Sequence, residues 1–313
     1  MFLTRRALLT RLLPSLLAGA AASASCGATD PPLVVTAGEP GGFYIEFADL
    51  LVAALRTSGT TARAVKSGGS VDNIRRVASG QAALGLTLLD TAQSAVTGTA
   101  PFERVLPLSA LGRVYENYMQ LVVRAEDPAD SVADLAGRSV ALGAEGSGAA
   151  VFGERLLAAA GVAARAAHQP LRDAVQALES GSTDALLWSG GVPTPALAGL
   201  AARRPIRLLP LATHLPALRA AYGPVYGPAT VPAGGYAGAP AVPTIGVANL
   251  LICADTLPDE AARQIVRTLV TDAPELVPDA ALGTQYLDQR SLIGTEPVPL
   301  HAGAAAGYRD LHG

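Results

Sequence analysis

The feature that most constrains the fold of this chain is an alternation of short apolar strands and amphipathic helices, with glycine at the junctions. After a β-branched run, PLVVTAG, the segment FADLLVAALRTSG carries apolar residues at helical spacing. The order continues through TARAVKSGG, SVDNIRRVASGQ and AALGLTLLD as strand, helix and strand. We interpret Ser70 as the N-cap of the second helix. A βαβαβ order predicts a mainly parallel sheet flanked by helices.

A second α/β series follows the first. Residues 132–162 predict a helical turn, a strand, a glycine loop and a helix, and residues 171–191 predict another helix and strand. From Pro258 onward the pattern is helical, with an amphipathic segment DEAARQIVRTLV. The chain is therefore predicted to contain two α/β units and a helical C-terminal region.

Two apolar segments, NYMQLVVRA and TIGVANLLIC, are candidate crossovers between the units, so the second unit is predicted to be inserted into the first. The expected domains are 32–120 plus 250–313 and 121–249, joined by a hinge. Residues 223–243 are rich in proline and glycine, which predicts an ordered, irregular segment before the second crossover. Because ligands of open α/β sheets bind at the carboxyl ends of strands, we expect a common cleft between the units.

The N-terminal segment MFLTRRALLTRLLPSLLAGAAASASC, residues 1–26, has the basic start, apolar stretch and small-residue end of an export signal. Arg5 and Arg6 indicate twin-arginine export, with Sec export as the alternative. Cys26 occupies the position of an acylated lipoprotein cysteine, whereas cleavage after Ala24 would release a soluble protein. The apolar stretch is shorter than the roughly 20 residues of a membrane span. We therefore expect an extracytoplasmic protein, at the cell surface or in the periplasm, held at the membrane by a lipid.

Composition and spacing argue against several functions. Charged residues make up 16% of the chain and the net charge is −3, so no basic face for nucleic acid is expected. Cys253 lies in the apolar run GVANLLICAD, which predicts a buried strand and no disulfide with Cys26. The four histidines lack metal-ligand spacing, and neither a cofactor fingerprint nor a GxSxG nucleophile pattern is present. We expect no metal, no cofactor and no enzymatic activity.

Four glycine-bearing turns fall at predicted strand ends: AGEPGGFY, KSGGSVDN, GAEGSGAA and WSGGVPTP. Turns without side chains expose backbone N–H groups, and a following helix adds the positive end of its dipole. The turn GAEGSG lacks the lysine of a nucleotide-binding P-loop, so a nucleotide phosphate does not fit it. The turns together predict a site for a small anion, of which a carboxylate is the simplest.

Six segments occur in the order found in one family: AGEPGGFY, SGGSVDNIRRVASGQAALGL, DLAGRSVALGAEGSGA, DALLWSGGVPTPAL, VPAGGY and PLHAGAAAGYRD. From residue 32 onward the chain resembles the TAXI family of TRAP transporter solute receptors. The resemblance implies an α/β, two-domain type II periplasmic-binding-protein fold with a ligand cleft between domains joined by a hinge. It also implies capture of an organic acid or an amino acid such as glutamate, delivery to a TRAP-type membrane permease, and no catalysis.

The positions that match the family's motifs would form the ligand site. The resemblance implies that Tyr44 closes over the ligand and that Asp90 lies at the end of the third strand. Two alternatives stay open, since Ser70 could serve only as an N-cap and Trp188 could fill the core instead of forming a cleft wall. The ligand-binding residues so implied are Gly42, Tyr44, Ser70, Asn73, Asp90, Gly146, Ser147, Gly148, Trp188 and Tyr236.

Departures from the family's pattern bear on specificity. Glu39 and Glu145 stand inside two of the anion-binding turns, and Ile45 with Glu46 replaces an aromatic residue and a proline. An acidic group beside the site disfavours a dicarboxylate and predicts a ligand with a cationic group as well as a carboxylate. The alternative is that both glutamates point to solvent. Two other functions also fit the pattern: a protein that presents its ligand to a membrane receptor kinase, and a surface-anchored enzyme on the same fold.

Overall fold

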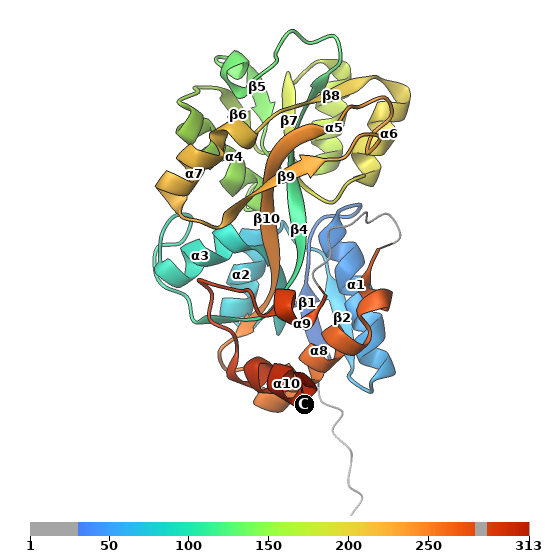
Figure 1. Ribbon diagram of the computed structural model, residues 1–313, viewed down its shortest axis with the longest axis vertical. Coiled ribbons are helices and arrows are strands. Elements are labelled where there is room, and N and C mark those ends of the chain that lie inside the picture. The colour runs from blue at the N-terminus through green and yellow to red at the C-terminus, as the bar shows by residue number, and fades with distance from the viewer. Residues whose placement is uncertain (1–30, 279–286, 313) are drawn as a thin grey trace, which may run out of the picture. The chain divides into compact units, whose positions relative to one another are not determined.

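A mixed sheet of ten strands forms the centre of the computed structural model, which describes residues 31–278 and 287–312 (Figure 1). The strand order is β2-β1-β3-β10-β4-β7-β5-β6, with β8 paired to β4 and β9 paired to β10. The predictions for residues 1–26, including acylation of Cys26, concern a segment outside the described residues.

The predicted alternation at the start of the chain is confirmed. Strand β1 pairs in parallel with β2 and with β3, so these strands share one carboxyl edge. We call β1–β3 with their helices the first half. Its elements are β1 (Leu33–Thr36), α1 (Phe43–Thr57), β2 (Ala62–Val65), α2 (Ser70–Ala78), β3 (Leu84–Leu88) and α3 (Leu89–Thr97).

The second α/β series is also present and forms what we call the second half. Its elements, in chain order, are η1 (Val132–Leu135), β5 (Ser139–Ala141), α4 (Gly148–Ala160), β6 (Arg165–Ala167), α5 (Leu171–Ser180), β7 (Ala185–Gly190), α6 (Pro195–Arg203), β8 (Ile206–Leu209), η2 (Ala212–His214) and α7 (Leu215–Tyr222). Strand β5 pairs in parallel with both β6 and β7, as the pattern predicts.

Two long strands, β4 (Leu108–Arg124) and β10 (Val242–Ala254), run from one half to the other (Figure 1). They are antiparallel to each other, β10 is antiparallel to β3, and β4 is antiparallel to β7. The sheet is therefore mixed: the strands predicted within each α/β series pair in parallel, and β4 and β10 add antiparallel pairs at its centre. Strand β4 leaves the first half and reaches the second half where the parallel strand β7 ends. The two strands therefore run in opposite directions and pair antiparallel. As a result, the carboxyl edges of the two halves face each other.

Residues 223–243 are ordered, as expected, and contain a further strand. β9 (Tyr226–Val231) forms an antiparallel hairpin with β10, with Val231 opposite Val242. The C-terminal elements are α8 (Asp259–Thr271), η3 (Ala273–Leu276), α9 (Gln289–Leu292) and α10 (Ala302–His312). The predicted domain boundaries after residues 120 and 249 fall inside β4 and β10, and the division into two domains stays a prediction.

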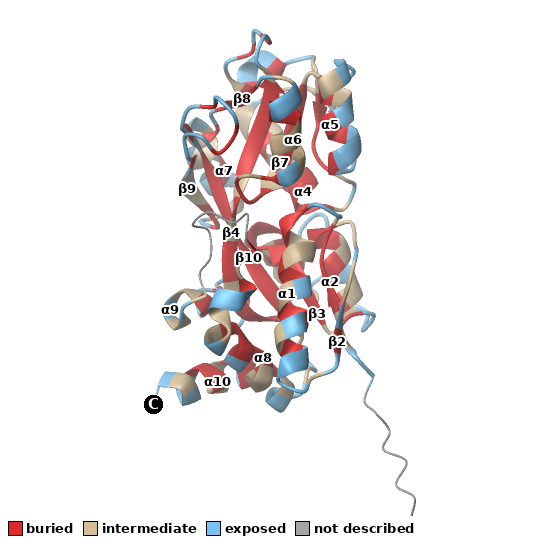
Figure 2. Ribbon diagram, turned by 90° about the vertical axis from the view of Figure 1, so that its right-hand side faces the viewer, coloured by how far each residue is buried: buried red, intermediate tan, exposed pale blue. Residues whose placement is uncertain are grey.

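Helices cover both faces of the first half, and the strands between them are largely buried (Figure 2). Phe47 and Leu51 of α1 pack in one core cluster with Leu251 of β10. Cys253 is fully buried in the same cluster, which confirms its expected role as a small hydrophobic residue. Within the described ranges, no helix combines the length and apolar character that crossing a membrane requires.

Candidate functional site

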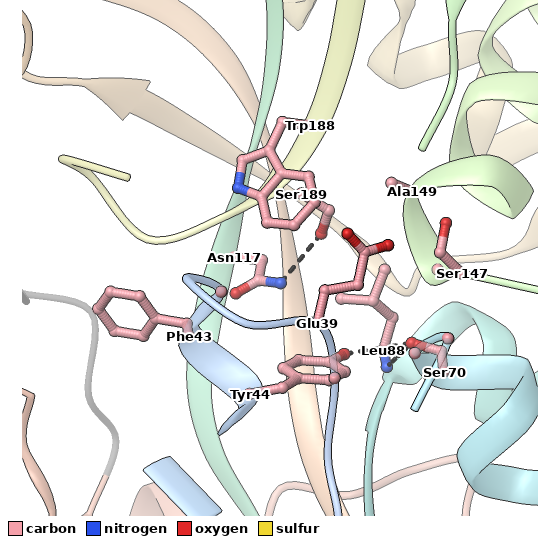
Figure 3. A pocket seen from close by; sticks show the side chains of 15 residues that line it. Glu39, Phe43, Tyr44, Ser70, Leu88, Asn117, Ser147, Ala149, Trp188 and Ser189 are labelled. Carbon is pink, nitrogen blue, oxygen red and sulfur yellow. Dashed lines mark hydrogen bonds between the residues drawn. The ribbon is translucent and has the colours of Figure 1, made fainter. Parts of the chain in front are cut away.

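A small cavity lies where the carboxyl edges of the two halves meet (Figure 3). Its volume is about 50 Å³, whereas a single water molecule needs roughly 10–15 Å³ by the same measure. The cavity therefore suits a compact ligand. The cavity wall includes six of the residues expected from the sequence: Gly42, Tyr44, Ser70, Ser147, Gly148 and Trp188.

Three helices, α1, α2 and α4, begin at this cavity. Each follows a strand of its half, so its N-terminus points across the carboxyl edge of the sheet. Gly69, the N-cap of α2, has φ +110°, a conformation open to glycine and strained for other residues. In α4, the Ala150 N–H donates to the Ser147 side chain at 3.1 Å, which leaves the Gly148 and Ala149 N–H groups without an intrahelical partner. Such helix ends favour an anion.

The hydroxyls of Tyr44 and Ser70 form a pair at the cavity wall, 3.2 Å apart. Ser70 Oγ also accepts from the Leu88 N–H at 3.0 Å. Whichever hydroxyl donates within the pair, one O–H remains to donate elsewhere. Burial raises the pKa of the Tyr44 phenol, so this group stays protonated and remains a donor.

The interpretation of Ser70 as an N-cap was wrong. Ser70 is the first residue of α2, Gly69 is the N-cap, and no side chain caps this helix. The Ser70 hydroxyl is turned instead toward Tyr44 and the end of β3. Ser147 is the residue that caps a helix here, and since its oxygen accepts from Ala150, its O–H can still donate into the cavity.

Asn73 is fully buried beneath the cavity and does not line it. Its Oδ1 accepts from Thr36 Oγ1 at 2.7 Å, and its Nδ2 donates to the carbonyl oxygens of Ala37 and, at 2.7 Å, Leu86. These bonds tie α2 to β3 and to the β1 end. Protein groups therefore already bond both polar atoms of this amide. Its role is structural, and it does not face a ligand.

We expect Asn73→Ala to lower the free energy of unfolding by about 2–3 kcal/mol, because three buried hydrogen bonds are lost and their partners stay buried. Urea denaturation measures the change. Asn249 on β10 is equally buried, but neither polar atom of its side chain has a partner in the described chain. Asn249→Ala is the matched control, and an equal loss in both variants would contradict the structural role of the Asn73 amide.

Three other expected residues lie away from the cavity wall. Asp90 belongs to the first turn of α3, not to the end of β3, and forms an ion pair with Arg155 of α4 at 3.2 Å. Tyr236 donates to Gln120 Oε1 and accepts from the Thr194 N–H at 3.0 Å, and burial raises its pKa to about 12. The Gly146 carbonyl accepts from the Val71 N–H at 3.0 Å, which joins the halves.

The two unusual glutamates have different surroundings. Glu39 lines the cavity, and its carboxylate accepts from the Leu171 N–H at the start of α5 at 2.9 Å. Burial raises the pKa of Glu39, and the nearby charge of Asp173 raises it further. Glu145 is exposed. The alternative that both glutamates point to solvent therefore holds for Glu145 and fails for Glu39.

Two polar residues of the cavity wall were missed by the sequence analysis. Asn117 of β4 donates from Nδ2 to Ser189 Oγ of β7 at 3.0 Å, and both residues line the cavity. Asn117 stands in the strand LSALGRVYENYMQLVVR directly after Glu116 and shortly before Gln120, so no local pattern singled it out as a residue of the site. Trp188 proves to be both cavity wall and core, since it lines the cavity and is 8% exposed.

The chemistry of the wall is simple. Its residues include no arginine, lysine or histidine, so an anion there would be held by N–H groups and hydroxyls. Across the described ranges, no group of three or more His, Cys, Asp or Glu side chains could hold a metal ion.

Several solved structures share this fold. The periplasmic binding protein BugD matches with a TM-score of 0.57 at 15% identity, over 90% of this chain and 94% of that chain. MatC from Rhodopseudomonas palustris with bound malate matches with a TM-score of 0.55 at 16% identity, over 80% and 88%. ArtJ from Geobacillus stearothermophilus, an arginine-, lysine- and histidine-binding protein, matches with a TM-score of 0.52 at 9% identity, over 79% and 92%.

These likenesses confirm the expected periplasmic-binding-protein fold, in which two α/β units flank a cleft. The match of a family model extends over residues 34–311. The chain therefore belongs to the NMT1-like family.

Proposed function

We propose that this chain is an extracytoplasmic solute-binding receptor that captures a small ligand bearing a carboxylate, such as an amino acid or an organic acid. One observation carries the proposal: three helix N-termini and two hydroxyl donors meet at a cavity whose wall has no basic side chain. The ligand-binding residues are Gly42, Tyr44, Ser70, Ser147, Gly148 and Trp188, together with the wall residues Glu39, Asn117 and Ser189.

The receptor binds its ligand without transforming it. Domains 32–120 plus 250–313 and 121–249 hinge through β4 and β10, and the ligand stabilises the closed arrangement through contacts made only there. Direct contacts between the halves, such as the Val71 N–H to the Gly146 carbonyl and the Leu171 N–H to Glu39, support closure around a small volume.

The closed receptor delivers its ligand to a TRAP-type membrane permease, as the resemblance to the TAXI family implies. The export signal predicted from residues 1–26 supports a location outside the cytoplasm, with Cys26 acylated at the membrane surface. Transport by the permease reconstituted with and without this receptor tests the delivery step. Uptake that does not depend on the receptor would contradict it.

Calorimetric titration with propionate, succinate, 2-oxoglutarate, glutamate and glutamine tests the binding step. We expect at least one of the monocarboxylates or amino acids to bind, and succinate to bind more weakly, because its second carboxylate would lie beside Glu39. Binding of none of these carboxylates, or equal binding of the uncharged analogue propionamide, would overturn the proposal.

Ser147→Ala tests the donors of the wall. Loss of the hydroxyl donor to a carboxylate should weaken binding by about tenfold to hundredfold, and loss of the cap should lower the free energy of unfolding by about 1 kcal/mol. Ser131→Ala is the matched control, because Ser131 is the N-cap residue of η1, its hydroxyl donates to the Asp134 carboxylate at 2.8 Å, and it does not line the cavity. This control should lose stability alone, and a similar loss of affinity in both variants would show that the Ser147 hydroxyl does not touch the ligand.

A further inference from the structure

The Glu39 side chain reaches from one half of the molecule to the other. Glu39 lies in the turn between β1 and α1 of the first half, and its carboxylate accepts a hydrogen bond from the Leu171 N–H of the second half at 2.9 Å. Glu39 also lines the cavity, together with Ala149 and Ser189 of the second half. Figure 3 shows its carboxylate pointing toward these two residues. A side chain of the protein thus makes the bridging contact that a ligand carboxylate would otherwise make.

The helix that Glu39 meets has no side-chain cap of its own. Leu171 is the first residue of α5, and the N-cap is Pro170, whose ring has no atom that accepts a hydrogen bond. The Glu39 carboxylate therefore binds one of the free N–H groups at the positive end of this helix. Burial raises the pKa of Glu39 and the bond from the Leu171 N–H lowers it, so the helix end favours the ionised carboxylate.

The charges of the cavity wall limit how many carboxylates it can hold. Among the described residues of the wall, Glu39 is the one acidic side chain and there is no basic one. A ligand with one carboxylate makes two carboxylates in all, whereas a ligand with two makes three, in a volume of about 50 Å³ without a cation. Without the Glu39 side chain, a ligand with two carboxylates would restore the count of two.

We propose that Glu39 is a specificity-determining residue: its carboxylate occupies the place that a second ligand carboxylate would take at the start of α5, and so restricts the receptor to ligands with one carboxylate. This inference rests on the proposed capture of a carboxylate. Since Glu39 forms part of the wall, loss of its side chain beyond Cβ extends the cavity and frees the Leu171 N–H. A dicarboxylate then bridges the halves in place of Glu39.

Glu39→Ala is expected to convert the protein into a receptor for dicarboxylates. Succinate and glutarate are compared with their half-amides, succinamate and glutaramate, which have nearly the same size and one charge less. The dicarboxylate preference is the affinity for the diacid divided by the affinity for its half-amide. In calorimetric titration it should lie below one for the wild type, and Glu39→Ala should raise it about tenfold to hundredfold for at least one pair. An unchanged preference in both pairs would overturn the proposal.

Glu39→Gln separates occupation of the place from repulsion by the charge. Glutamine keeps the length of the side chain and an oxygen that accepts from the Leu171 N–H, but it carries no charge. This variant should raise the dicarboxylate preference by no more than about fivefold, the effect of one nearby charge. A rise as large as that in Glu39→Ala would show that Glu39 only repels the second carboxylate, and the proposal would fail.

Glu145→Ala is the matched control for removing an acidic residue from a glycine turn. Glu145 is exposed and does not line the cavity. Its substitution changes the net charge by the same amount as Glu39→Ala and should leave the dicarboxylate preference unchanged. If both variants raise the preference equally, the effect belongs to the net charge and Glu39 does not determine specificity.

Hydrogen exchange at the Leu171 amide locates the second carboxylate. This amide should exchange faster in Glu39→Ala than in the wild type, and the diacid that gains affinity should restore its protection more than the half-amide does. The rise in Tm caused by each ligand is a second measure of binding, which a folded variant of lower stability also gives. A diacid that binds Glu39→Ala and leaves the Leu171 amide unprotected would overturn the proposal, whereas propionate binding to the wild type would still support the carboxylate site.

Discussion

Gly148→Ala is expected to weaken ligand binding by about a hundredfold, because the added methyl group blocks closure. A Cβ at Gly148 would lie 2.5 Å from Leu88 Cδ1 and 2.6 Å from Ser70 Oγ. Gly148 begins α4 in the second half, whereas Leu88 and Ser70 belong to the first half. Both contacted side chains are buried, and Ser70 is held by hydrogen bonds to Leu88 and Tyr44, so neither can easily move aside.

Calorimetric titration measures this loss of affinity, with the carboxylate that the wild-type protein binds most tightly as the ligand. Hydrogen exchange at the Val71 amide provides a second reading, since this N–H donates across the cleft to the Gly146 carbonyl and should exchange faster when the halves separate. Gly199→Ala in α6 is the matched control, because its Cβ would meet only the end of the Arg203 side chain at 3.5 Å. Unchanged affinity in Gly148→Ala would show that the ligand binds without this closed contact.

Much of the fold could be predicted because its signals are local. The glycine junctions and the helical spacing of FADLLVAALRTSG mark α1, although the helix begins earlier, at Phe43. The strand β9 was not predicted, since proline and glycine are unfavourable in strands and only pairing with β10 shows that YGPATV forms one. Helix α3 was missed for a related reason. It follows β3 directly, without a turn residue that would mark the change.

The candidate site, like the fold, could be predicted from the sequence only in part. The glycine turns could be found because the exposure of backbone N–H groups follows from local sequence, and they place Ser147 and Gly148 at the cavity. The partners of polar side chains depend on contacts distant in sequence. Asn117 meets Ser189 across 72 residues. Asn73 and Asp90 match motif positions, but only the folded structure shows that protein groups occupy their polar atoms. The partners of Asn73 come from the first half, and the partner of Asp90 is Arg155 of the second half.

The ion pair of Asp90 with Arg155 joins α3 of the first half to α4 of the second half, and neither residue lines the cavity. Asp90 is fully buried, the Arg155 side chain is 11% exposed, and the Tyr226 hydroxyl donates to the same carboxylate oxygen at 3.0 Å. Arg155 also donates to Ser94 Oγ at 2.6 Å and lies over the Tyr222 ring. These contacts hold the two halves together at a place outside the cavity.

Arg155→Met should therefore be strongly destabilising, by about 3–5 kcal/mol, because it leaves the Asp90 carboxylate buried without its counter-charge. Asp90→Leu combined with Arg155→Met removes both charges and should recover most of the loss. Urea denaturation of the wild type, both single variants and the double variant gives the coupling energy directly. If the losses of the single variants simply add in the double variant, the pair is not coupled. If instead Arg155→Met keeps its stability but loses ligand affinity and Val71 amide protection, the halves have separated to hydrate Asp90, and the pair then acts as a lock on closure.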